Sequence, residues 1–521
     1  MSLQFILGNS GSGKSSYLYQ QILKEAQENP KQNYLVIVPE QFTMQTQREL
    51  VRLQENHAIM NVDVLSFARL AYRVFDELGK QNLVVLEETG KNLVLRKVAA
   101  KKQKNLCVLG GNMNKMGYIS EVKSLISELT QYNISPEALQ DFIRQEDLAE
   151  NLRLKLQDVL VMYQGFSEFL RGRYITAEEV LSLLCDVAKE SEIIRDSVIV
   201  FDEFTGFTPI QNQLFGVLLK LASEVLVTVT IDAKEDFYHC RGMQELFSMS
   251  KKTIATLLTI AGEEKIAVLD PVVLDKGAVL RYKEAPGLYF MEQNLFRPKH
   301  ARFRQKKEEV QIFSCKDPKE ELDFVAKEIA MLVRKESYCY KEIAVVTGDV
   351  TTYANYVPEI FEKYEIPYFI DQTKNILFHP LTEFIRAALE VVESDFSYES
   401  VFRFLRSGLS GIETAEIDAL ENYVIAKGIR GAKRYSTVWR TVSRNGKEDL
   451  EALNATREHL IALLIPFYEE LKKKDSNTLD MTKALYQLLV SLEVERQLKD
   501  KQEEYEQAGD LAKAKEYAQI Y

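Results

Sequence analysis

The sequence has few cysteines, and none of them is paired in a motif. Five stand singly among 521 residues, with no CxxC spacing. This pattern excludes a zinc ribbon, a redox dithiol and a disulfide framework. We therefore expect buried free thiols at Cys107, Cys185, Cys240, Cys315 and Cys339. The five histidines show no ligand-like spacing, and we assign none of them a role.

Long apolar runs are also absent. No stretch reaches the roughly 18 apolar residues that a membrane-spanning helix needs. The N-terminal sequence MSLQFILGNSG has no basic region before its short apolar stretch, as a secretory signal would have. We therefore expect a cytoplasmic location.

Basic residues are fewer than acidic residues. The chain has 66 Lys and Arg against 77 Asp and Glu, a formal net charge of -11. Such a chain does not attract nucleic acid as a whole, so any binding needs a local basic patch or a partner subunit. The 46% hydrophobic and 27% charged residues are typical of a folded globular protein. The length allows about three or four domains.

The clearest motif is GNSGSGKS at residues 8–15, which fits the pattern GxxxxGK[ST]. It follows an apolar strand and precedes an amphipathic helix, as its mechanism requires. Its backbone N–H groups bind phosphates, the lysine reaches the β- and γ-phosphates, and the final hydroxyl binds Mg²⁺. The sequence thus predicts an ATP site formed by Gly8, Asn9, Ser10, Gly11, Ser12, Gly13, Lys14 and Ser15.

A second motif, SVIVFDEF, begins at residue 197. Its apolar run places Asp202 at a strand end, where it is a candidate Mg²⁺ ligand beside Ser15, and Glu203 is a candidate for orienting the attacking water. A simple strand-to-loop exit has the same pattern, so that alternative stays open. Gln211 is either a polar sensor or a surface helix residue. The threonines of the next strand, Thr228 and Thr230, are expected to be core residues.

Apolar periodicity predicts how the first half of the chain is divided. Short β-branched runs in residues 1–85 and 193–265 indicate one parallel α/β domain that contains both motifs. Residues 86–192 have helical periodicity almost throughout and predict a helical insertion in that domain. Residues 266–310 contain three prolines and a basic stretch, KHARFRQKK, and predict a linker.

The second half repeats this alternation. Residues 311–380 predict the start of a second α/β domain, with strands at EVQIFSC, EIAVVTG and IPYFID. Residues 381–521 predict a helical insertion domain. The chain stops within KAKEYAQIY without a capping residue, so we expect that domain to be incomplete and the chain to be part of a longer one.

One stretch of the acidic chain is basic. Residues 427–447, KGIRGAKRYSTVWRTVSRNGK, contain seven Lys or Arg and no acid. Basic side chains follow a phosphate backbone and aromatic rings stack on bases. This stretch is the best candidate for binding DNA, through Arg430, Lys433, Arg434, Tyr435, Trp439 and Arg440. A solvated loop with its tryptophan in a core is the alternative.

Several segments together resemble the AddB family. They are the P-loop, the DEF and TPIQ sequences around residue 205, VPEQFTMQTQREL, VDVLSFARLAYRVF, EIAVVTGDVTTYANYVPEIFEKYEIPYFID, VFRFLRSGLSGI and ENYVIAKGIRG. AddB is the B subunit of the bacterial AddAB helicase-nuclease, an ATP-dependent helicase and deoxyribonuclease. The resemblance covers nearly the whole chain and marks it as an N-terminal portion.

The resemblance implies superfamily 1 helicase-like P-loop domains, with parallel sheets flanked by helices and large helical insertions. It also implies an exonuclease complex that processes DNA double-strand breaks for homologous recombination. An AddA-like partner would form a heterodimer and supply the motor, while this chain scans single-stranded DNA for a hotspot. The nuclease centre and an iron–sulfur cluster are expected only in the C-terminal part, since no cysteine here matches those ligands.

This sequence departs from an active helicase. The usual motif III, a strand followed by GDxxQ, is replaced by TVTIDAKED, and no arginine-finger motif can be identified. We therefore expect ATP and Mg²⁺ binding with guidance of single-stranded DNA, in a protein that contacts both single-stranded and double-stranded DNA and in which this chain is not the main motor. Whether the chain hydrolyses ATP or unwinds DNA alone stays open. Two alternatives stay open, a P-loop NTPase or kinase acting on a small molecule and a scaffold held by a non-catalytic ATP clamp.

Overall fold

The computed structural model describes residues 1–54, 56–80, 84–113, 115–145, 148–277, 280–297, 301–305, 309–371, 375–442 and 449–520. The chain forms two compact units, residues 1–313 and 314–521. Each unit has its own hydrophobic cores.

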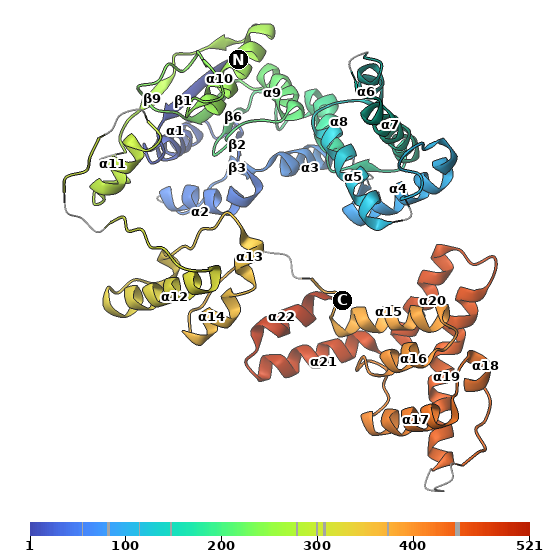
Figure 1. Ribbon diagram of the computed structural model, residues 1–521. Coiled ribbons are helices and arrows are strands. Elements are labelled where there is room, and N and C mark those ends of the chain that lie inside the picture. Colours follow the sequence, from blue (N-terminus) through green and yellow to red (C-terminus); the bar gives the residue numbers. More distant parts are fainter. Residues whose placement is uncertain are drawn as a thin grey trace. The chain divides into compact units, whose positions relative to one another are not determined.

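A parallel sheet organises the first unit (Figure 1). Its strands are β1 (Ser2–Gly8), β2 (Tyr34–Ile37), β3 (Val62–Leu65), β6 (Val198–Phe201), β7 (Glu224–Thr230), β8 (Ala267–Val268) and β9 (Val272–Leu274). The order is β3-β2-β6-β7-β1, and β8 and β9 both pair with β1. The two motif-bearing strands, β1 and β6, therefore lie on either side of β7.

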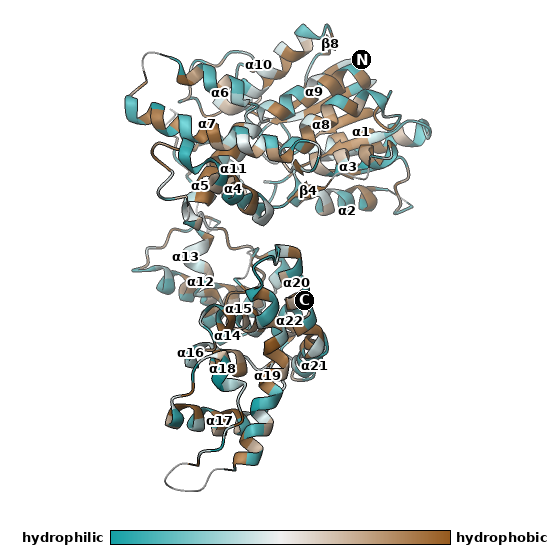
Figure 2. Ribbon diagram, turned by 90° about the vertical axis from the view of Figure 1, so that its right-hand side faces the viewer, coloured by the Kyte–Doolittle hydropathy of each residue, from teal (hydrophilic) through white to brown (hydrophobic). Residues whose placement is uncertain are grey.

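Helices cover both faces of this sheet. Alternate residues of a strand point to opposite faces. Leu3 and Phe5 of β1 pack in one core, and Ile6 packs in the other. The first core includes α3 (Phe67–Glu77), α8 (Glu179–Val187), α9 (Pro209–Leu221) and α10 (Ser248–Glu263), and the second includes α1 (Lys14–Glu28) and α2 (Thr43–Leu53). Burial on two faces explains the continuous apolar strands, which are visible in Figure 2.

A helical insertion interrupts the sheet domain between α3 and α8. It contains β4 (Val85–Leu86), α4 (Glu88–Lys102), α5 (Met116–Gln131), α6 (Pro136–Ile143), α7 (Glu150–Leu170) and β5 (Ile175–Thr176). The buried Asp158 carboxylate accepts three backbone N–H bonds of 2.7 Å from residues 107–109, which fixes the α4–α5 connection. Helix α8 lies within the predicted insertion, yet it packs in the sheet core.

The predicted linker at residues 266–310 is wrong over much of its length. It contains β8, β9 and α11 (Pro286–Asn294), and it belongs to the first unit. Strand β8 pairs with Ser2 and Leu3 of β1, and β9 pairs with Ile6 to Gly8 at the other end of that strand. They have only two and three residues, which is too short for an alternating pattern to reveal them.

The second unit is helical in its described part. Its helices are α12 (Pro318–Lys335), α13 (Val350–Ala354), α14 (Val357–Lys363), α15 (Pro380–Glu393), α16 (Tyr398–Leu405), α17 (Thr414–Lys427), α18 (Ala432–Tyr435), α19 (Leu450–Lys472), α20 (Thr478–Ser491), α21 (Val494–Gln507) and α22 (Leu511–Ile520). Short 3-10 helices lie at Glu40–Phe42, Gln103–Asn105, Ala188–Glu190 and Tyr340–Glu342.

The three strands predicted between residues 309 and 371 are not formed by the residues that the structure describes there. A strand exists only through hydrogen bonds to a neighbouring strand. Ile312, Val346 and Phe369, one in each predicted strand, are 94%, 92% and 88% exposed. The apolar pattern was present, but these segments have no strand partner here.

The thiols also differ from expectation. Cys185 is buried, Cys107 and Cys339 are exposed, and the other two are half-buried. All five are free, and buried thiols were therefore correctly predicted only at Cys185. Among the described helices, none combines the length and the apolar character needed to cross a membrane.

A candidate nucleotide-binding site at the edge of the sheet

The P-loop connects the carboxyl end of β1 to the first residue of α1, Lys14. Gly11 and Gly13 have φ values of +75° and +93°, a left-handed backbone that glycine adopts without strain. At Gly8 a Cβ atom would lie 2.4 Å from the carbonyl oxygen of Leu274, so only glycine fits there. The three motif glycines are thus required by the shape of the loop.

Polar groups of this loop fit a bound phosphate. The Ser12 hydroxyl is buried and has no hydrogen-bond partner within the described structure. Lys14 Nζ donates to the carbonyl oxygens of Gly8 and Asn9 at 3.0 Å each. Burial lowers the pKa of Lys14, while the negative charges of Asp202 and Glu203 oppose this effect. A triphosphate would supply both the missing acceptor and the compensating charge.

Asp202 lies at the end of β6 and is 1% exposed. Its carboxylate accepts hydrogen bonds from Tyr19 Oη at 2.7 Å, Thr228 Oγ1 at 2.5 Å and the Glu203 N–H at 3.0 Å. Burial and the nearby carboxylate raise the pKa of Tyr19. The network joins α1, β6 and β7 beneath the P-loop.

Glu203 lies next to Ser15. The Ser15 hydroxyl donates to Glu203 Oε1 at 3.4 Å, whereas Asp202 is held by Tyr19 and Thr228. Glu203 has a φ of +64°, uncommon for a residue with a side chain. Desolvation, followed by the charge of Asp202, raises the pKa of its carboxyl group. The hydrogen bond that the structure shows for the Ser15 hydroxyl is thus with Glu203.

The oxygen atoms of Ser15, Asp202 and Glu203 are of the type that Mg²⁺ prefers. Within the described ranges, no cluster of three or more acidic, histidine or cysteine side chains could hold a metal by itself. Mg²⁺ at such sites is usually bound by one or two carboxylates together with substrate phosphates. The residues therefore fit an ion that enters with a nucleotide, and the Mg²⁺ assignment to Ser15 and Asp202 stays a prediction.

Tyr19 and Thr228 were not predicted as site residues. Tyr19 comes four residues after Ser15, on the same face of α1. Phe201 pairs with Val227 in the parallel register of β6 and β7, so Asp202 and Thr228 follow side by side. The helix spacing could have identified the tyrosine, but the threonine required the strand register.

Gln211 has a capping function. Its Oε1 accepts the Thr208 N–H at 2.9 Å, and its own N–H donates to Thr208 Oγ1, which forms a capping box at the start of α9. The side chain is thereby committed to the helix terminus. Of the two hypotheses for Gln211, the contacts favour a helix residue over a polar sensor of the nucleotide.

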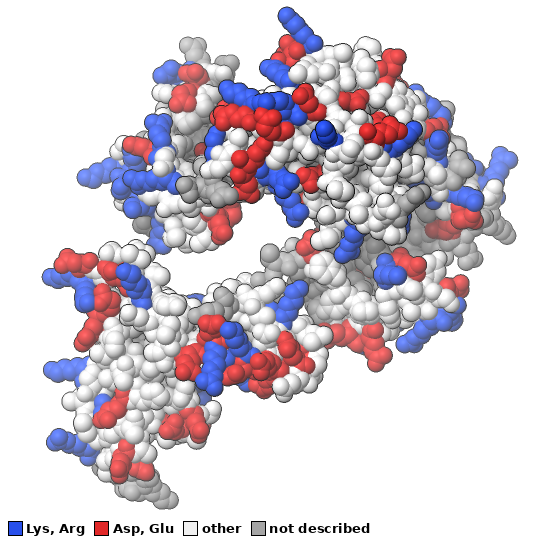
Figure 3. Space-filling model, turned by 180° about the vertical axis from the view of Figure 1, so that it is seen from behind, with Lys and Arg blue, Asp and Glu red and all other residues white. Residues whose placement is uncertain are grey.

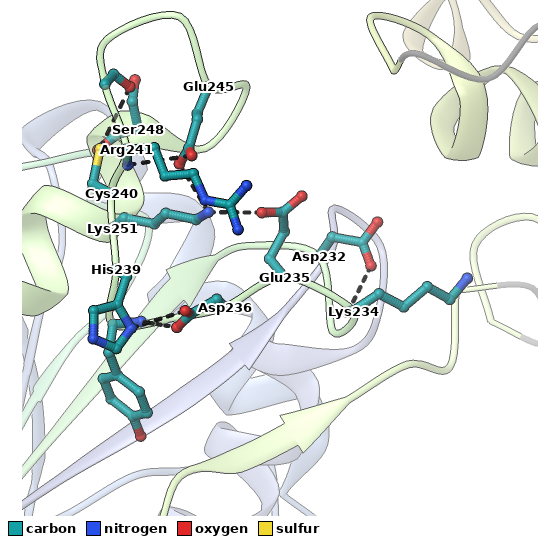
Figure 4. Close-up of polar contacts among 12 residues, drawn as sticks. Asp232, Lys234, Glu235, Asp236, His239, Cys240, Arg241, Glu245, Ser248 and Lys251 are labelled. Atoms are coloured by element: carbon teal, nitrogen blue, oxygen red, sulfur yellow. Dashed lines mark hydrogen bonds and ion pairs between the residues drawn. The ribbon is translucent and has the colours of Figure 1, made fainter.

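The segment after β7 replaces motif III and forms a paired polar loop (Figure 4). The buried Lys251 ammonium contacts Glu235 at 2.7 Å and Glu245 at 2.9 Å. Asp232, just beyond β7, forms an ion pair of 2.9 Å with Arg297. The carboxylates of Asp232, Glu235 and Glu245 are therefore each paired with a cation of the same unit. This loop follows β7 at the edge of the sheet where the P-loop begins.

The structure corrects one part of the predicted DNA patch. Tyr435 is 0% and Trp439 is 7% exposed, and both belong to the core of the helical unit. Neither ring can stack on a base while it is buried, so this structure favours the alternative of a tryptophan in a core, and DNA binding by this stretch stays a prediction. Arg430, Lys433, Arg434 and Arg440 are exposed, and residues 443–447 lie outside the described residues. On the face drawn in Figure 3, basic and acidic side chains are interspersed.

Comparison with known proteins shows the family of this chain. The family model described as ADDB, N-terminal, matches residues 5–292. The B subunit of the ATP-dependent helicase/deoxyribonuclease of Lachnoclostridium phytofermentans is 41% identical over 100% of this chain and 46% of its own length. The corresponding B subunits of Clostridium novyi and Clostridium kluyveri are 33% and 32% identical, again over the whole chain. The chain spans about half the length of these relatives, 46% in the first. On this match, the chain belongs to the ADDB family.

Proposed function

We propose that this chain is the nucleotide-binding N-terminal part of the B subunit of an ATP-dependent helicase and deoxyribonuclease. The observation that carries the proposal is the P-loop itself, with Lys14 and Ser15 at the carboxyl edge of a parallel sheet and Glu203 within 3.4 Å of the Ser15 hydroxyl. The name of the relatives supplies the ATP dependence and the deoxyribonuclease assembly.

The proposal includes the DNA role and a partner subunit. The whole protein would process double-strand breaks for recombinational repair, with an AddA-like protein as the main motor, and this region would bind and scan single-stranded DNA. The self-paired loop of Glu235, Glu245 and Lys251 supports a binding role over a motor role. None of the residues labelled in Figure 4 is a glutamine of the motif III kind.

The test of nucleotide binding is Lys14→Ala. Removing an ammonium that bonds phosphate costs about 1.5 to 3 kcal/mol, so ATP affinity should fall about tenfold to a hundredfold. Lys24→Ala, on the exposed face of the same helix, is the matched control. Titration of a fluorescent ATP analogue with Mg²⁺ measures both. Absence of binding by the wild type would refute the proposal, and Lys14-dependent turnover stimulated by single-stranded DNA would refute the non-motor role.

The remaining basic residues of the patch make a second prediction. The double variant Lys433→Glu with Arg440→Glu should weaken binding of a single-stranded oligonucleotide and flatten its salt dependence, because each lost phosphate contact lowers the slope by about one. Lys474→Glu with Lys483→Glu makes the same charge change at exposed positions of the same unit. Fluorescence anisotropy across a salt series compares the two pairs, and equal weakening by both would reject the patch.

A further inference from the structure

A segment far from the P-loop in sequence lies against it. Strand β9 runs parallel to β1, with Gly8 opposite Leu274. Since parallel strands end at the same edge of a sheet, the residues that follow β9 emerge beside the P-loop. A Cβ atom at Gly11 would lie 2.8 Å from Arg281 Cδ, and one at Gly13 would lie 2.6 Å from Leu280 Cδ1.

The Arg281 guanidinium is directed at the loop. Its Nη1 donates to the Ser10 hydroxyl at 3.2 Å. The side chain is exposed, and no ion pair joins it to a carboxylate among the residues that the structure describes. Its polar contact in that part of the chain is with a neutral hydroxyl, and the guanidinium therefore has donors left for a further acceptor.

Arg281 and Lys14 share one electrostatic environment. The positive charge of Arg281 contributes to lowering the pKa of Lys14, and it also acts on Glu203, where it opposes the rise in pKa. The two cations thus contact the same glycine-rich loop, Lys14 at Gly8 and Asn9 and Arg281 at Ser10, and their mutual repulsion favours the binding of an anion there. A polyphosphate satisfies both, because arginine binds phosphate oxygens with two parallel hydrogen bonds.

We propose that Arg281 is a phosphate-binding residue of this nucleotide site, supplied by the segment after β9. The inference rests on the proposed nucleotide binding and adds to it a residue that the P-loop motif does not contain. In this arrangement Lys14 approaches the phosphates from the helix and Arg281 approaches them from the neighbouring segment. The site then holds its triphosphate between two cations of the same domain.

The test compares Arg281→Ala and Arg281→Lys with Lys283→Ala, an exposed lysine of the same turn. Titration with a fluorescent ATP analogue and Mg²⁺ should show affinity about tenfold to a hundredfold lower for Arg281→Ala, as expected for a lost charged hydrogen bond. Arg281→Lys should retain part of the affinity, because it keeps the charge without the planar fork. Lys283→Ala should bind as the wild type does.

The outcomes separate the two proposals. If the wild type binds in a Lys14-dependent way and Arg281→Ala binds equally well, Arg281 has no phosphate contact and only this inference fails. Tighter binding by Arg281→Ala would show that the guanidinium obstructs the loop, which also overturns the inference. If the wild type does not bind the analogue, the proposed function fails and the inference with it. Melting temperatures without nucleotide verify that each variant is folded.

Discussion

Replacing Asp202 with alanine should lower the free energy of unfolding of the first unit by about 3 to 5 kcal/mol. The carboxylate accepts from Tyr19, Thr228 and the Glu203 N–H, and it is 1% exposed. Alanine would leave two buried hydroxyls and one N–H without their acceptor. Each orphaned donor costs about 1 to 3 kcal/mol, which exceeds the desolvation energy that removal of the charge returns.

The measurement uses the single tryptophan of the chain. Trp439 lies in the second unit, so its fluorescence follows the unfolding of that unit, while far-UV circular dichroism follows both. In a urea titration, Asp202→Ala should shift the circular dichroism transition of the first unit and leave the tryptophan transition in place. A chain with two units has no single two-state transition, so the midpoints must be compared unit by unit.

Asp202→Asn is the matched control. The amide keeps one acceptor oxygen for Thr228, and the Tyr19 hydroxyl is free to rotate and accept from the new NH₂ group. The loss should then be about 1 to 2 kcal/mol. If Asp202→Ala unfolds within about 1 kcal/mol of the wild type, the three hydrogen bonds do not stabilise the domain.

The P-loop could be predicted from sequence because its geometry requires particular residues. Gly8, Gly11 and Gly13 each occupy a position that a side chain would disturb, and the flanking strand is buried on both faces. Such local requirements appear in the sequence directly. The family resemblance rests on similar motifs, and the match to residues 5–292 confirms it.

The contributions of Thr228 and Arg281 could not be predicted in this way. Thr228 reaches Asp202 through the register of two strands, and Arg281 reaches Ser10 across 271 positions of sequence. Strands β8 and β9, which bring the arginine to the loop, have only two and three residues. Local periodicity contains no information on pairing across such separations. The site is therefore larger than its motif.

The amino-acid composition of residues 427–447 suggested aromatic rings available to bases, but composition does not distinguish a buried ring from an exposed one. Trp439 stacks on Tyr423 with ring centroids 5.0 Å apart, and its Nε1–H donates to the carbonyl oxygen of Arg434 at 3.1 Å. The buried Arg457 donates to the carbonyl oxygen of Tyr435 at 2.9 Å. Arg430, Lys433, Arg434 and Arg440 are exposed next to this aromatic core in the sequence, and the charge pattern alone could not distinguish the two kinds of position.

Trp439→Ala should therefore lower the free energy of unfolding of the second unit by about 3 to 5 kcal/mol, the usual cost of removing a large buried aromatic side chain. Val438→Ala, at a neighbouring side chain that is 55% exposed, should change it by less than about 1 kcal/mol. Urea denaturation followed by circular dichroism measures both, because the variant has no tryptophan to report.

Trp439→Phe separates the core role from base stacking. Phenylalanine keeps most of the buried ring and loses the hydrogen bond to Arg434, so we expect a loss of about 1 to 2 kcal/mol. If the ring belongs to the core, this variant should bind single-stranded DNA as the wild type does, and Trp439→Ala should lose DNA binding only under conditions in which the second unit unfolds. If the ring of Trp439 instead stacks on a base, a folded Trp439→Ala variant should lose about 1 to 3 kcal/mol of DNA-binding free energy. That result would mean that the segment opens to expose its aromatic core when DNA binds.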